Sequence, residues 1–175
     1  MRHKSSPQSG FTLIELIIVI VIMGILAALI SGNFLNSLQK GRDARRKNDL
    51  NQIIRALELY YEDKRTYPLT SPPFGSQFCD GTCGPGTKTY MMKVPNDPNT
   101  SYSYQYMVDP AGQYYYLLSC LENYVNDKGP GVSANGFCNG PTLPCGEPPP
   151  ECGDCGICRF SVNSSNATPL PTHAP

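Results

Sequence analysis

The chain has 175 residues, and its 14 basic residues balance its 14 acidic residues. This length suits one membrane span and one compact domain, and the zero net charge gives no overall attraction to nucleic acid. The only histidines, His3 and His173, lie near the two ends, so we expect no histidine-based catalytic or metal site in the domain. No glycine-rich phosphate loop follows a strand. We therefore expect no enzyme activity, no cofactor and no metal.

One acidic residue interrupts an otherwise apolar run near the N-terminus. Between Phe11 and Ile30 only Thr12, Glu15 and Gly24 are not apolar. Twenty helical residues at about 1.5 Å each span roughly 30 Å, the thickness of the hydrocarbon core of a bilayer. A carboxylate in such a span costs about 2–3 kcal/mol or more, so Glu15 should have a partner or a role.

The residues at the start of this run carry a family resemblance. A short polar leader ends in Gly10, and Phe11-Thr-Leu-Ile-Glu15-Leu follows it. This pattern resembles the N-terminus of type IV prepilins and pseudopilins. The resemblance implies cleavage after Gly10 by a prepilin peptidase and methylation of the new Phe11 amine. It also implies that Glu15 neutralises the Phe11 amine of a neighbouring subunit during assembly. The alternative is a plain single-pass anchor whose Glu15 reaches the near membrane interface.

Helical periodicity continues beyond the apolar run. Apolar residues recur at positions that share one helix face, namely Leu50, Ile53, Ile54, Leu57 and Tyr61. Lys64 and Arg65 suit a last turn, and Tyr67-Pro68 supplies the stop. One helix from Phe11 to about Lys64 would be about 80 Å long. This again resembles pilins, whose first half packs in the filament core while the second half lies under a small sheet.

A cluster of basic residues follows the apolar run, and it comprises Lys40, Arg42, Arg45, Arg46 and Lys47. We expect this cluster to be a solvated face that touches lipid headgroups or a neighbour's acidic residues. DNA binding is the alternative, but nucleic acid is not an expected partner. The cluster competes with Arg2 and Lys4 as an orientation signal, and the resemblance implies that the N-terminus stays inside.

The apolar period changes to two after Pro68. Tyrosines alternate with polar residues from Tyr102 to Val108, and an apolar stretch runs from Gln113 to Leu121. Asp109-Pro-Ala-Gly112 between them is a turn sequence. The pattern predicts an antiparallel hairpin, with Tyr90 to Val94 as an additional strand. Pro95-Asn-Asp-Pro98 before the hairpin resembles a pseudopilin pattern.

The pseudopilin resemblance raises the question of calcium. Asn123, Asn126 and Asp127 follow the last predicted strand, where major pseudopilins hold a calcium ion. Calcium takes six to eight oxygen ligands, and carboxylates are scarce here. We therefore favour an ordinary polar loop.

All eight cysteines lie on the side of the membrane segment that should face outward, which predicts disulfides. They are Cys79, Cys83, Cys120, Cys138, Cys145, Cys152, Cys155 and Cys158. The spacing suggests that Cys79 pairs with Cys83 and Cys120 with Cys138, the latter resembling the terminal loop of many pilins. Two local disulfides would join the last four. The alternative is that these four thiolates form a metal or redox module. Residues 163–175 are rich in Ser, Thr, Pro and Asn, and we expect them to be disordered or glycosylated.

These features predict an α+β, pilin-like fold. A long N-terminal helix, transmembrane and then amphipathic, packs on a small antiparallel β-sheet with disulfide-bonded C-terminal loops. The expected parts are a cleaved leader over 1–10, a transmembrane or filament-core helix over 11–34, its amphipathic continuation over 35–66, a globular head over 67–140 and a Cys/Pro-rich tail over 141–175.

The predicted function is that of a structural subunit of a type IV pilus-like filament. The alternative within this class is a pseudopilin of a type II secretion or DNA-uptake system, and the alternative of another class is a membrane-anchored metal or redox module. The expected partners are identical or related pilin subunits, a prepilin peptidase, a pilus assembly platform and, before assembly, the lipid bilayer. We expect a single-pass protein of the cell membrane with a cytoplasmic N-terminus, which later joins an extracellular pilus or a cell-envelope filament.

Overall fold

The computed structural model describes residues 10–127, 129–133 and 151–167. Within these residues one helix precedes five strands, in the order α1, β1, β2, β3, β4, β5. The chain divides into two compact units, residues 1–38 and residues 39–175. The first unit is helical over most of its described part. The second, which we call the head, holds the C-terminal part of α1 and all five strands.

Helix α1 runs from Leu13 to Lys64, which confirms the long helix that the sequence predicts. In the head it is amphipathic, because Leu50, Ile53 and Leu57 are fully buried. The helix ends where Arg65 adopts a φ of 59°. This left-handed conformation is a common way to terminate a helix, and the Arg65 N–H still donates to the Tyr61 carbonyl at 2.7 Å.

Strands β3 (Gln105–Val108) and β4 (Tyr115–Ser119) form the predicted antiparallel hairpin. At its turn, Gly112 has a φ of 66° and donates its N–H to the Asp109 carbonyl at 2.8 Å. A left-handed φ is costly for most side chains, so glycine suits this position. The alternating pattern and the turn residues together located this element correctly.

Strand β5 (Phe160–Asn163) lies antiparallel to β4 and completes a three-stranded sheet of order β3-β4-β5. The expectation of disorder from residue 163 onward is therefore wrong for residues 163–167. Ser164 is buried, and its N–H donates to the Tyr115 carbonyl at 3.2 Å. Backbone pairing with β4 orders this polar segment without a long apolar run. Residues 168–175 lie outside the described residues.

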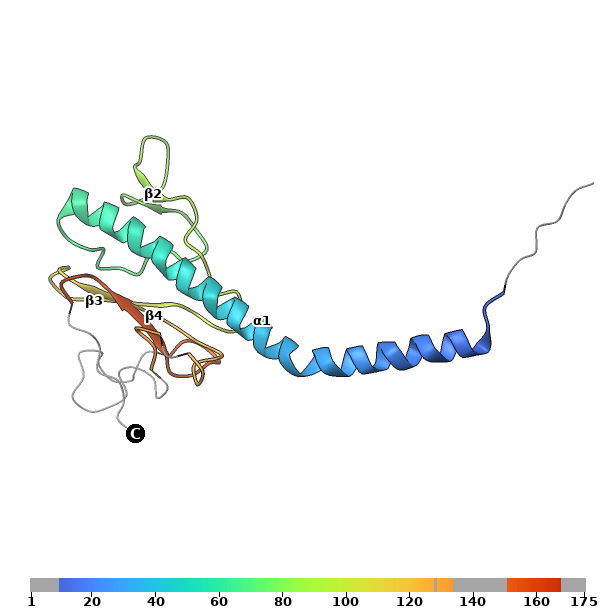
Figure 1. The fold of residues 1–175 in the computed structure, drawn as a ribbon. Coiled ribbons are helices and arrows are strands. Elements are labelled where there is room, and N and C mark those ends of the chain that lie inside the picture. The colour runs from blue at the N-terminus through green and yellow to red at the C-terminus, as the bar shows by residue number, and fades with distance from the viewer. Residues whose placement is uncertain (1–9, 128, 134–150, 168–175) are drawn as a thin grey trace, which may run out of the picture. The chain divides into compact units, whose positions relative to one another are not determined.

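Strands β1 (Phe78–Cys79) and β2 (Thr89–Met91) form a separate two-stranded antiparallel sheet. The additional strand predicted near Tyr90 is therefore present, but it pairs with β1 and not with the hairpin. The ring of Tyr60 on α1 lies 5.5 Å from that of Phe78 and 5.1 Å from that of Tyr90, centroid to centroid. These contacts pack the small sheet on α1, and Figure 1 shows the C-terminal part of α1 running between β2 and the β3–β4 pair.

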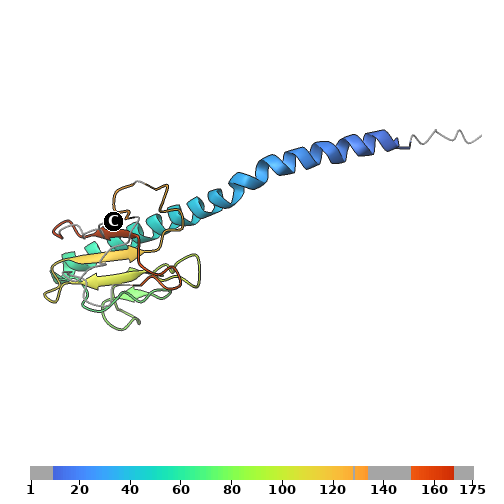
Figure 2. The same ribbon diagram turned by 90° about the horizontal axis from the view of Figure 1, so that it is seen from below.

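The three-stranded sheet buries apolar side chains on both faces. On one face Tyr115 and Leu117 of β4 join Leu50, Ile53 and Leu57 of α1 in the main core. On the other face Tyr116 and Leu118 pack with Cys152 and Cys158 of the C-terminal segment. Because successive strand residues point to opposite faces, β4 serves both cores. Figure 2 looks onto these strands from below. The head thus confirms the α+β, pilin-like fold with disulfide-bonded C-terminal loops.

Candidate functional site

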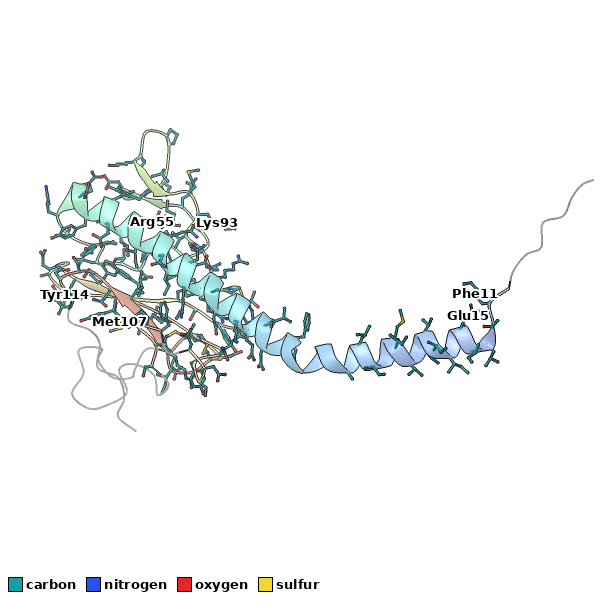
Figure 3. The ribbon with its side chains drawn as sticks, viewed as in Figure 1. Phe11, Glu15, Arg55, Lys93, Met107 and Tyr114 are labelled. Carbon is teal, nitrogen blue, oxygen red and sulfur yellow. A yellow bond between two sulfur atoms is a disulfide. The ribbon has the colours of Figure 1, made fainter. Side chains whose placement is uncertain are left out.

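The predicted assembly residues lie at the start of α1, with Phe11 just before the helix and Glu15 in its first turn (Figure 3). Phe11 is 92% exposed. The carboxylate of Glu15 accepts hydrogen bonds from the Thr12 backbone N–H at 2.8 Å and from the Thr12 hydroxyl at 2.6 Å. The Glu15 N–H donates in return to the Thr12 hydroxyl at 3.3 Å. This reciprocal arrangement is a capping box, in which Thr12 and Glu15 together cap the N-terminus of α1.

The helix that follows exposes apolar side chains all around. From Leu13 to Leu26 the large apolar side chains are between 46% and 77% exposed. A helix that is apolar on every side is normally buried by lipid or by other helices. No helix in the described part of the chain combines the length and the mean hydropathy that a membrane crossing requires. The transmembrane span over residues 11–34 stays a prediction.

The basic cluster that follows is solvated only in part, because Lys40 and Arg45 are exposed while Arg46 is not, and this corrects the sequence-based expectation of a solvated face. Arg46 is completely buried. Its guanidinium donates to Asp97 through Nε at 2.8 Å and Nη2 at 2.9 Å, and to Asp43 through Nη1 at 2.7 Å. Nη2 also donates to Glu122 at 2.8 Å. Three carboxylates from three parts of the chain therefore share one guanidinium, which lies 5.2 Å from the centroid of the Tyr102 ring.

The neighbouring cations are paired as well. Arg42 donates through Nε to Glu122 at 2.8 Å, and this contact, with help from Arg46, holds the pKa of Glu122 below its usual range. Arg45 is largely exposed and lies 3.9 Å from Asp49. Burial raises the pKa of Asp49 even though the hydroxyl of Tyr104 donates to it at 3.0 Å.

Lys47 and Asp43 hold the loop that follows β4. Lys47 Nζ lies 2.5 Å from Asp127, and its hydrogen bond lowers the pKa of that carboxyl. Asp43 accepts the backbone N–H groups of Glu122 at 3.0 Å and of Asn123 at 2.8 Å. Within the described ranges only Lys40 of the basic cluster has no carboxylate partner. The ion pairs of the cluster thus join α1 to the rest of the head. Few of its charges remain available to bind the phosphates of DNA.

The cysteine pairing differs from the expected one in two places. Cys79 is bonded to Cys83, as the spacing suggests. Cys120 pairs with Cys155, not with Cys138, and Cys152 pairs with Cys158. The expectation of two local disulfides among the last four cysteines is therefore wrong for Cys155, which is joined to the end of β4, whereas Cys152–Cys158 is a local disulfide of the expected kind. Cys138 and Cys145 lie outside the described residues.

Sequence reasoning missed the buried ion cluster because its members are far apart in the chain. Arg46 is 51 residues from Asp97 and 76 from Glu122. The one local signal was the Pro95-Asn-Asp-Pro98 motif, in which Asp97 is buried. A buried aspartate requires a partner, but nothing in the motif indicates which cation supplies it.

Comparison with known proteins gives the chain a family. The prokaryotic N-terminal methylation motif matches residues 5–31. Type II secretion system core protein G of Pseudomonas aeruginosa is 36% identical over 105 residues, which cover 57% of this chain and 73% of that protein. Its counterpart in Klebsiella michiganensis is 33% identical over 119 residues, covering 68% of this chain and 78% of the relative.

The same protein of Aeromonas hydrophila is 33% identical over 96 residues, covering 52% of this chain and 67% of the relative. No solved structure matches the chain significantly. The methylation motif and these identities point to the same family. The chain belongs to the type IV pilin and pseudopilin family, with the type II secretion system core proteins G among its relatives.

Proposed function

We propose that this chain is a structural subunit of a type IV pilin-like filament of the cell envelope, made as a membrane-anchored precursor. The observation that carries the proposal is the first unit, where an apolar helix exposes its side chains on every side and begins with Phe11 and Glu15. Such a surface needs lipid before assembly and other copies of the helix afterwards. Related pilin-like subunits are therefore the partners that it fits.

The maturation steps follow from the same residues. A prepilin peptidase would cut between Gly10 and Phe11, and the new Phe11 amine would be methylated. In the filament the Glu15 carboxylate would meet the Phe11 amine of a neighbouring subunit, so that each charge has a partner in an apolar environment. The N-terminus would stay cytoplasmic until an assembly platform extracts the subunit from the bilayer.

The relatives favour a pseudopilus over a surface pilus, because those compared are type II secretion core proteins. We therefore place a secretion-type pseudopilus first among the filaments that the subunit could build. The metal alternative is less favoured, since Cys152, Cys155 and Cys158 are all in disulfides and offer no thiolates to a metal.

The test is the filament yield of a Glu15→Ala variant. Without the carboxylate the neighbour's amine has no partner, so we expect normal cleavage but roughly tenfold less filament, the effect of about 1.4 kcal/mol per subunit. Immunoblots of the sheared fraction and of the membrane pool measure the two quantities. Glu62→Ala is the matched control, because Glu62 is an exposed carboxylate on the same helix. Equal filament yields from both variants would refute the pairing.

A further inference from the structure

The loop after β4, residues 122–127, is where the pseudopilin resemblance implies a calcium ion. Calcium takes six to eight oxygen ligands, with carboxylates prominent among them. The loop has two carboxylates, Glu122 and Asp127, and Glu122 already accepts hydrogen bonds from Arg42 and Arg46. Asp127 is thus the one carboxylate of the loop that is not bonded to an arginine. The donor set is too small for calcium.

Further oxygens of Asp127 and Asn123 also accept hydrogen bonds from N–H donors. Asp127 accepts the Gly129 N–H on Oδ1 at 3.0 Å. The side-chain oxygen of Asn123 accepts the amide of Asn126 at 2.9 Å, and its carbonyl accepts the N–H groups of Asn126 and Asp127 at 3.2 Å each. A divalent ion would have to displace these donors. The residues present therefore do not fit calcium.

A cation is nevertheless present, and the chain itself supplies it. Lys47 Nζ lies 2.5 Å from Asp127 Oδ2 and 5.2 Å from the centroid of the Phe160 ring on β5. The Lys47 side chain is 30% exposed, so its charge is partly shielded from water. One ammonium therefore contacts both the 122–127 loop and β5 from α1.

The surroundings oppose a second cation. A hollow of about 290 Å³ beside the loop is lined by Asp43, Asn123, Asn126 and Asp127, but also by Lys40 and Lys47. Both oxygens of Asp43 are used, by Arg46 and Glu122 on Oδ1 and by Asn123 on Oδ2. Two ammonium groups at the wall of the hollow repel a divalent ion.

We propose that Lys47 is the built-in cation of the 122–127 loop, and that the head of this chain folds and holds this loop without calcium. The ammonium neutralises Asp127 and anchors the loop, so the free calcium concentration does not alter the order of the loop. This inference concerns the head alone and does not depend on polymerisation of the subunit.

The experiment compares the thermal unfolding midpoint of the full chain in detergent with millimolar calcium chloride and with excess EGTA. We expect the wild-type midpoint to be the same in both, and calorimetry to detect no heat of calcium binding. Lys47→Met should lower the midpoint by roughly 2–4 °C in both buffers. It should also speed hydrogen exchange at Gly129, whose N–H bonds to Asp127. A saturable calcium response of the wild type would overturn the proposal.

A charge reversal makes the test sharper. Lys47→Glu sets a second carboxylate against Asp127, so it should lower the midpoint in EGTA and regain part of the loss in calcium. Lys93→Glu is the matched control, because Lys93 is exposed and has no carboxylate partner among the described residues. If Lys47→Glu lowers the midpoint in EGTA no more than Lys93→Glu does, Lys47 does not anchor the 122–127 loop and the proposal fails.

Discussion

At the residue scale, Arg46 shows that the role of a cation on α1 depends on which face of the helix it occupies. Arg46 is completely buried, whereas Arg55, nine residues further along α1, is exposed and lies on the helix surface in Figure 3. A buried charge is tolerated only when its partners replace the lost water. Three carboxylates do so for Arg46. Removing the guanidinium would leave these carboxylates without their shared cation.

We therefore predict that Arg46→Met lowers the free energy of unfolding by about 3–5 kcal/mol, the usual effect of breaking a buried ion pair. Arg55→Met, the matched change at an exposed position, should alter it by less than about 0.5 kcal/mol. Urea unfolding of the full chain in detergent, followed by circular dichroism, measures both. Similar values for the two variants would mean that the buried cluster does not stabilise the head.

The assembly residues and the buried arginine differ in how well their roles could be predicted from the sequence. Phe11 and Glu15 could be proposed directly, because a carboxylate in an apolar run is a local anomaly. The role of Arg46 could not, since its partners Asp97 and Glu122 are distant in sequence and its neighbours are also basic. A run of cations is the same pattern whether it faces water or carboxylates from elsewhere in the fold.

At the element scale, local periodicity predicted α1 and the β3–β4 hairpin, because each element carries its own repeat and its own stop or turn. Strand β5 has four residues and pairs with a strand more than 35 residues earlier. Its position depends on the register with β4 and on disulfides whose pairing the sequence leaves open. The Cys120–Cys155 bond joins the end of β4 to the segment just before β5. That bond is one cause of the ordered structure of residues 163–167, which the sequence did not predict.

We predict that replacing both Cys120 and Cys155 by serine loosens β5 more than β3 or α1. In the chain-entropy model this 35-residue separation gives about 4 kcal/mol, against about 2 kcal/mol for the 4-residue separation of Cys79 and Cys83. Hydrogen exchange should speed up at Arg159 and Ser161, whose N–H groups bond to Ser119 and Gly131. The corresponding serine pair at Cys79 and Cys83 is the control, and it should leave β5 protected. Faster exchange throughout the head would contradict this division.

At the scale of the whole molecule, the two units differ in the interactions that stabilise each of them. The first unit exposes large apolar side chains and has no described core of its own. The head has two apolar cores, a buried ion cluster and disulfides. Because changes at distant, independent sites usually have additive effects, alterations at the N-terminus should change maturation and assembly without altering the stability of the head.

Gly10 is where this separation can be tested most directly. A Cβ added at Gly10 would meet no atom of the described residues within 4 Å, so the described part of the chain gives no steric reason to require glycine there. A peptidase that binds the Gly10–Phe11 bond would have such a reason. Gly10→Val should therefore leave the precursor uncut and the filament absent, while the unfolding of the head stays unchanged. Intact mass spectrometry should show the wild type without residues 1–10 and with one added methyl group, and the variant with its leader intact. Gly41→Val, at an equally open position of α1, is the control and should mature normally. A mature mass from Gly10→Val would contradict cleavage at this bond.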